Sequence, residues 1–130
     1  GKGGIGKSTV AAGVSLALAK QGRRVLHVGC DPKHDSTLAL LGEQPVRTVI
    51  DQIFSQPVGS LRREHLIMPG KQGIDCIESG GPKSGVGCGG RAVSRMFELF
   101  EELSVLEEGR YDVAVFDVLG DVVCGGFAMP

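Results

Sequence analysis

The first nine residues have the composition and spacing of a phosphate-binding loop. They read GKGGIGKST and fit G-x-x-x-x-G-K-[ST], a pattern in which backbone N–H groups surround nucleotide phosphates. Glycine suits such a loop because a side chain would hinder the tight curl and penalise positive φ. Lys7 is expected to reach the β- and γ-phosphates, and the Ser8 hydroxyl to ligate Mg²⁺. A glycine-rich turn that only caps a helix is the alternative interpretation. The residues expected to contact the nucleotide through this loop are Gly1, Lys2, Gly3, Gly4, Ile5, Gly6, Lys7, Ser8 and Thr9.

Four acidic residues follow apolar runs that are typical of interior parallel strands. They are Asp31, Asp35, Asp117 and Asp121. In open α/β sheets ligands bind at the carboxyl ends of the strands, so these acids are expected beside the phosphate-binding loop. Asp117 ends its strand in the Walker B arrangement, in which the carboxylate holds Mg²⁺ or its water shell. Capping of the next turn is the alternative. The sequence leaves open which of the other three positions the attacking water, contacts Mg²⁺ through its hydration shell or senses the γ-phosphate.

Cys88 and Cys124 are each followed by two glycines. Small neighbours leave backbone N–H groups free to bond to sulfur and leave room for an inorganic cluster. An iron–sulfur cluster usually needs four thiolates, and a symmetric homodimer with the cluster on its twofold axis would supply them from two chains. The alternative is a pair of small buried hydrophobes, the commonest role of free cysteine. Cys30 and Cys76 lack such glycine pairs and are expected to pack in the core.

The elements that must position these residues follow from apolar periodicity and turn signals. Helices are expected at residues 9–21, 48–54 and 92–106. Interior strands are expected at residues 25–29, 74–78 and 111–117, and loops at 30–37, 55–72 and 118–127. A phosphate-binding loop followed by a helix and a strand is part of a right-handed βαβ unit. The expected fold is therefore a P-loop NTPase of the α/β class, with a mostly parallel sheet flanked by helices. Residues 1–130 are expected to form one ATPase domain that is truncated at both ends, because the strand before the loop and the C-terminal part are missing.

Composition excludes several broad classes. The 130 residues are 42% hydrophobic and 22% charged, which is ordinary for a globular domain with its own core. A formal net charge of −1 indicates neither a nucleic-acid-binding surface nor a basic membrane patch. No apolar run approaches the length of a membrane span. Four cysteines in a chain of this size do not indicate a disulfide scaffold, so a reducing cytoplasm is expected.

Five stretches of this sequence resemble the nitrogenase iron protein family. They are GKGGIGKST (1–9), GCDPKHDST (29–37), ESGGP (78–82), GVGC (85–88) and DVLGDVVCGGFAMP (117–130). The resemblance implies a homodimeric ATPase that bridges one 4Fe–4S cluster between its subunits through Cys88 and Cys124. It also implies that ferredoxin or flavodoxin supplies electrons, which pass singly to a larger dinitrogenase-like catalytic protein as MgATP is hydrolysed. Lys2 matches a lysine that crosses the dimer interface to the neighbour's nucleotide, and the four acids match nucleotide-sensing acids. Arg91 matches an arginine that is ADP-ribosylated in some members to switch them off.

Departures from the family pattern keep two alternatives open. His34 stands where many nitrogenase members carry alanine, and Gly89 follows the first cysteine where they commonly have alanine. The stretch DPKHDST is similar to the iron–sulfur ATPase subunits of protochlorophyllide and chlorophyllide reductases, whereas GGFAMP at 125–130 looks more like nitrogenase. The second alternative is a deviant P-loop partitioning ATPase without a redox role, which would dimerise but would not need the two cysteines.

Overall fold

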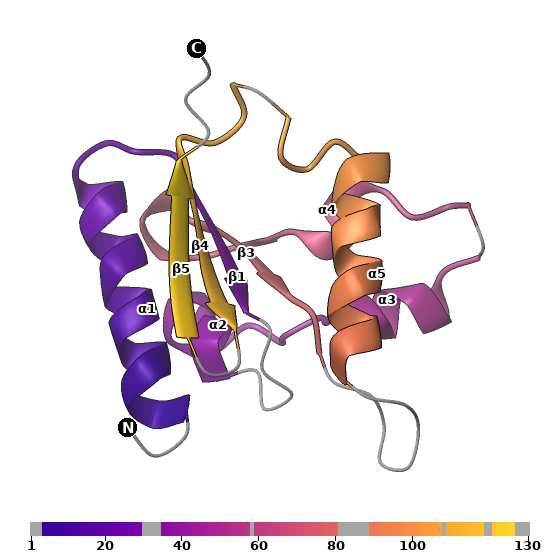
Figure 1. Ribbon diagram of the computed structural model, residues 1–130, viewed down its shortest axis with the longest axis horizontal. Helices are drawn as coiled ribbons and strands as arrows, with labels where there is room; N and C mark the ends of the chain where they lie inside the picture. Colours follow the sequence, from indigo (N-terminus) through magenta and orange to yellow (C-terminus); the bar gives the residue numbers. More distant parts are fainter. Residues whose placement is uncertain are drawn as a thin grey trace.

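A five-stranded sheet forms the centre of the fold, and its three middle strands are parallel (Figure 1). β1 (Val25–Gly29) lies between β3 (Asp75–Glu78) and β4 (Val113–Val118). At the two edges, β2 (Met68–Pro69) pairs antiparallel with β3, and β5 (Asp121–Gly126) pairs antiparallel with β4. The strand order is β2-β3-β1-β4-β5. The computed structural model describes residues 4–29, 35–57, 59–80, 89–107, 109–118 and 121–126.

The central strand β1 is buried along its whole length. This is expected of a parallel strand that is covered on both faces, and it explains the unbroken apolar character of the run apart from His27. β1 and β4 are direct neighbours, in a register that runs from Val25↔Val113 to Gly29↔Asp117. The predicted α/β class with a mostly parallel sheet is thereby confirmed, as is the prediction that these two strands lie inside the sheet.

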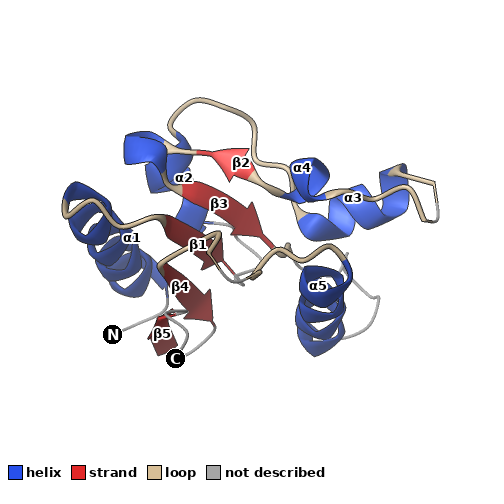
Figure 2. Cartoon of the chain, turned by 90° about the horizontal axis from the view of Figure 1, so that it is seen from above, coloured by secondary structure: helices blue, strands red, loops and turns tan. Residues whose placement is uncertain are grey.

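Helices cover both faces of the sheet (Figure 2). On one face lie α1 (Gly4–Lys20) and α2 (Asp35–Leu41), and on the other lie α5 (Gly89–Glu102), α3 (Val49–Ser55) and α4 (Arg63–Leu66). The short helix predicted at residues 48–54 is confirmed as α3. It begins after Thr48, whose Oγ1 accepts a hydrogen bond of 3.0 Å from the Asp51 N–H. Among the described helices, none combines the length and the apolar character that crossing a membrane requires.

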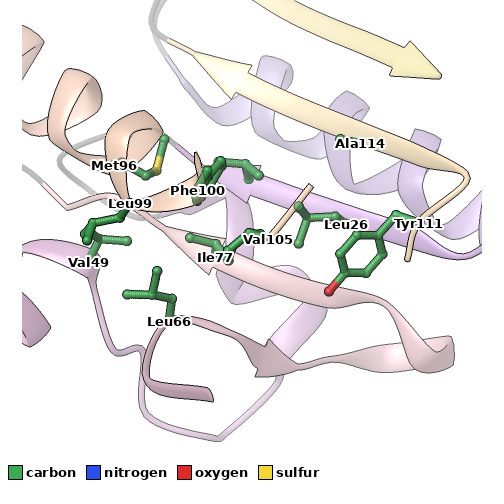
Figure 3. Packing of buried hydrophobic residues seen from close by; sticks show 11 residues of the cluster. Leu26, Val49, Leu66, Ile77, Met96, Leu99, Phe100, Val105, Tyr111 and Ala114 are labelled. Carbon is green, nitrogen blue, oxygen red and sulfur yellow. The ribbon is translucent and has the colours of Figure 1, made fainter. Parts of the chain in front are cut away.

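Each face of the sheet has its own apolar cluster, because side chains alternate between the faces along every strand. The cluster under α5 is drawn in Figure 3 and contains Leu26, Val28, Val49, Leu66, Ile77, Met96, Leu99, Phe100, Val105, Tyr111 and Ala114. The cluster under α1 and α2 contains Ala11, Ala12, Val25, Leu40, Leu41, Met68, Ile74, Cys76 and Val115. The predicted core position of Cys76 is confirmed, since its side chain is fully buried.

Several predicted loops and boundaries were wrong. Residues 35–37, which were expected in a loop, form the start of α2, and α5 begins at Gly89 and not at residue 92. Residues 121–126 form β5, because the chain turns back beside β4 and the β-branched pair Val122 and Val123 suits an edge strand. Residues 55–72 contain α4, β2 and a 3₁₀ turn, η1 (Lys71–Gly73), and are not loop throughout. α5 ends at Glu102 and not at residue 106, because Ser104 has φ 55° and the Val105 N–H donates back to the Phe100 carbonyl.

Candidate functional site

The first helix begins at the edge of the sheet where the parallel strands end. We call this the carboxyl edge and define it by Gly29, Glu78 and Asp117, which are paired across β3, β1 and β4. In Figure 1, α1 and α5 both start at this edge. Ligands bind at this edge in open α/β sheets, so the fold brings the predicted phosphate-binding motif to the expected place.

The backbone of α1 starts inside the motif, at Gly4, and not at residue 9 as the sequence predicted. The first four N–H groups of a helix have no acceptor within the helix. In α1 these groups belong to motif residues, from Gly4 to Lys7. They therefore remain available to an anion at the positive end of the helix dipole, which is the property that the motif requires.

Asp117 is a buried carboxyl group at the carboxyl edge, with only 1% of its surface exposed. It lies on the same face of β4 as Val115, which belongs to the cluster under α1. The carboxyl group therefore faces the side of the sheet that carries the motif helix. This is the position that the Walker B prediction gives it, near the end of an apolar interior strand.

A buried histidine lies on the same face as Asp117, one pleat further from the edge. His27 is fully buried, and its Nδ1 shares a hydrogen bond of 2.7 Å with the Ser15 Oγ of α1. Burial lowers the pKa of His27 from 6.5 to about 4, and the Asp117 carboxylate partly opposes this shift. The imidazole is therefore neutral at physiological pH.

The sequence prediction missed Glu78, a second acid at the carboxyl edge. Its side chain is fully buried, and the Thr37 hydroxyl of α2 donates a hydrogen bond of 2.9 Å to its Oε1. Glu78 and Asp117 flank Gly29 on opposite sides, so their Cα atoms lie about 10 Å apart at the usual strand spacing. The signal was present in the sequence, because Glu78 ends a predicted strand as Asp117 does.

The chain that leaves β3 is held firmly before it enters the segment that leads to Cys88. The Ser79 N–H donates to the Gly29 carbonyl at 2.9 Å, and the Ser79 carbonyl accepts from the Ile50 N–H at 3.1 Å. Gly80 has φ +78° and lies so close to Thr48 that a Cβ there would collide with the threonine side chain. The end of β3 is thus fixed between β1 and the start of α3.

Many predicted site residues lie beyond what the structure describes. Those outside the described residues are Gly1, Lys2, Gly3, Asp31 and Cys88. Those for which the backbone alone is described are Gly4, Ile5, Gly6, Lys7, Ser8, Thr9, Asp35, Arg91, Asp121 and Cys124. The backbone places Asp35 at the first residue of α2 and Arg91 in the first turn of α5.

The two predicted site residues of β5 occupy fixed positions along β4. Asp121 is paired with Val118 near the carboxyl edge, and Cys124 is paired with Val115 further into the sheet. Three steps along an antiparallel strand cover about 10 Å.

Two comparisons place this architecture among known proteins. The family described as "4Fe-4S iron sulfur cluster binding proteins, NifH/frxC family" has a model that matches residues 1–130. Among solved structures, the chain is similar to protein DIP2308 from Corynebacterium diphtheriae, with 22% sequence identity and a TM-score of 0.50. That match covers 98% of this chain and 52% of the other, so the chain spans about half the length of its structural relative. At this identity the likeness concerns the fold alone.

Proposed function

From the premise that this chain belongs to the NifH/frxC family of 4Fe–4S iron–sulfur cluster binding proteins, we propose that it is part of the ATP-dependent reductase component of nitrogenase. The observation that carries the proposal is the family match over residues 1–130, which includes the phosphate-binding motif and both glycine-flanked cysteines. The whole protein is a cytoplasmic homodimer in this proposal. It takes electrons one at a time from ferredoxin or flavodoxin and passes them to a larger dinitrogenase-like partner.

The residues at the carboxyl edge fit MgATP. The free N–H groups at the start of α1 and the Lys7 side chain would hold the phosphates, while Ser8 would ligate Mg²⁺. The buried Asp117 carboxyl group, on the face covered by α1, would contact the metal or its water shell.

The donor set of the chain fits half of an iron–sulfur cluster. Cys88 and Cys124 would supply two thiolates, and the same residues of a second copy would supply the other two. When bound, the cluster supplies one-electron storage, so that the electron donor is oxidised in one step and the catalytic partner is reduced in another. The Gly-Gly pair after each cysteine leaves backbone N–H groups for the sulfur atoms and little bulk beside them.

The remaining predicted residues would link the nucleotide to the cluster and to the second subunit. Lys2 would reach the nucleotide of the neighbouring subunit, and Asp31 and Asp35 would act on the γ-phosphate or the attacking water. Asp121 would sense the γ-phosphate and transmit its loss along β5 to the cluster ligand Cys124, about 10 Å away. Arg91, in the first turn of α5, would be the site of ADP-ribosylation where such regulation exists.

A nitrogenase-like reductase that acts on a tetrapyrrole is the second candidate. Two residues, His34 and Gly89, favour it, and the GGFAMP stretch favours nitrogenase. Both candidates use the same nucleotide and the same cluster, so the catalytic partner separates them. Reconstitution of the purified reductase with nitrogenase subunits, or with protochlorophyllide reductase subunits, distinguishes them by which mixture turns over with MgATP.

The decisive experiment is anaerobic purification of the full-length protein, followed by analysis of iron, sulfide and mass. We expect a dimer with four iron and four sulfide per two chains, as the family's cluster type requires. Cys88→Ser and Cys124→Ser should each lose iron, whereas the matched control Cys76→Ala should keep it, because Cys76 lies in the core. An iron-free dimer that hydrolyses ATP would instead indicate a partitioning ATPase.

A further inference from the structure

One carboxyl group lies between the end of β1 and the first turn of α2. Glu78, on the neighbouring strand β3, accepts the Thr37 hydroxyl at its Oε1, and the same carboxyl group lies against Gly29. A residue of β3 therefore links the end of β1 to the start of α2.

The contact at Gly29 depends on the absence of a side chain. A Cβ at this position would collide with the Glu78 carboxyl group, so any other residue would push that group away from β1. Gly29 is paired with Glu78 across the parallel ladder, and the Ser79 N–H donates to the Gly29 carbonyl at 2.9 Å. The carboxyl group and the end of β1 are thus held in one fixed arrangement.

The contact at Thr37 joins the first turn of α2 to β3 through a buried hydrogen bond. Both side chains are fully buried, and the donor–acceptor distance of 2.9 Å is that of a well-formed hydrogen bond. Thr37 lies two residues after Asp35, and two residues span at most about 7 Å. A change in the position of Thr37 must therefore move Asp35 as well.

We infer that Glu78 is a positioning residue of the nucleotide site. By joining Gly29 and Thr37, its carboxyl group fixes the distance between the end of β1 and the start of α2. It thereby fixes the place of Asp35, the first residue of α2, relative to the carboxyl edge. The inference rests on the proposed nucleotide function, and it assigns to Glu78 a role in distinguishing ATP from ADP rather than a direct contact with either.

A merely structural role for the Glu78–Thr37 pair makes a different prediction. Loss of the hydrogen bond would then lower the stability of the fold and weaken MgATP and MgADP alike. A positioning role instead lowers the preference for MgATP over MgADP, because the start of α2, with Asp35, is displaced while the phosphate-binding motif is not. The ratio of the two affinities separates the two roles.

The test uses the full-length protein and four variants. Thr37→Val removes the hydroxyl but keeps the shape, and Thr37→Ser restores a donor. Glu78→Gln keeps an oxygen that accepts from Thr37 but places an amide where the second carboxyl oxygen was. Ser15→Ala is the matched control, because it removes another buried hydroxyl that is bonded to a buried side chain on the same face. Dissociation constants for MgATP and MgADP are measured by calorimetry, with thermal midpoints and iron content beside them.

We expect Thr37→Val to lower the MgATP:MgADP affinity ratio about tenfold, within the usual range of coupling between linked sites. Glu78→Gln should lower the ratio by a smaller factor, and Thr37→Ser and Ser15→Ala should leave it within about twofold of wild type. An unchanged ratio in both Thr37→Val and Glu78→Gln overturns the inference, and so does a wild-type protein that binds no MgATP. If Thr37→Val does not fold, Glu78→Gln alone decides. A lowered ratio in a protein that contains no iron supports the positioning role and refutes the redox function.

Discussion

The buried imidazole of His27 gives the clearest quantitative prediction. Its pKa is about 4 in the folded protein and 6.5 in an exposed chain, because burial disfavours the charged ring. As the pH falls, the unfolded state takes up the proton first. His27 therefore costs no stability above pH 6.5 and an increasing amount between pH 6.5 and 4.

The size of the effect follows from those two pKa values. Between pH 7.5 and 5.0, linkage gives a loss of about 2 kcal/mol, and the loss approaches about 3 kcal/mol below pH 4. His27→Gln removes the titrating group, so this part of the pH dependence should disappear. The comparison cancels the contributions of the carboxyl groups that both proteins share.

Urea unfolding of the full-length protein at pH 7.5 and 5.0 measures the difference. Wild type should lose about 2 kcal/mol more than His27→Gln between the two pH values. Equal pH dependence in wild type and His27→Gln would refute the reasoning, whatever the absolute stability of the variant.

Three further predictions concern glycine, a buried hydroxyl and the path from nucleotide to cluster. Gly13→Ala should raise the free energy of unfolding by about 0.5–1 kcal/mol, because nothing lies near its added Cβ inside α1, whereas Gly29→Ala should lower it. Urea unfolding measures both, and a stabilised Gly29→Ala would contradict the geometry. Tyr111→Phe should lower stability by about 1 kcal/mol in the same assay, because its hydroxyl donates a hydrogen bond of 2.6 Å to the carboxyl group at the start of β3. Asp121→Asn should keep the cluster but remove the dependence of its midpoint potential on MgADP and MgATP, whereas Cys124→Ser should lose the cluster and still bind nucleotide. Identical wild-type potentials without nucleotide, with MgADP and with MgATP would exclude this coupling.

The centre of the fold could be predicted from the sequence because its signals are local. The run at 25–29 is almost wholly apolar, and the run at 111–117 ends in an acid, so both indicated interior strands and a ligand-binding edge. Thr48 followed by an apolar helical pattern was enough to place α3. Asp117 could be singled out from a local signal too, because it stands at the end of its own apolar run.

The rest of the site depends on neighbours that the sequence does not show. β5 was missed because an edge strand is defined by the strand that it pairs with, and its glycines and short length are typical of a loop. The position of Glu78 at the end of a predicted strand was visible in the sequence, but its contacts with Gly29 and Thr37 form only in the folded sheet. The low pKa of His27 likewise comes from the helix that covers it.

The parallel pairing of β1 with both of its neighbours also determines when the protein can fold. Arg24 precedes β1 and bonds to Asp112, just before β4, across 88 residues of chain. Sheets that depend on such distant contacts form slowly, because the entropy of closing the long loop is lost before strand pairing contributes any stabilisation. During synthesis β1 has no strand on its β4 side until the last part of this chain has emerged. An interrupted chain would expose an apolar strand edge, which is a recognised starting point for aggregation.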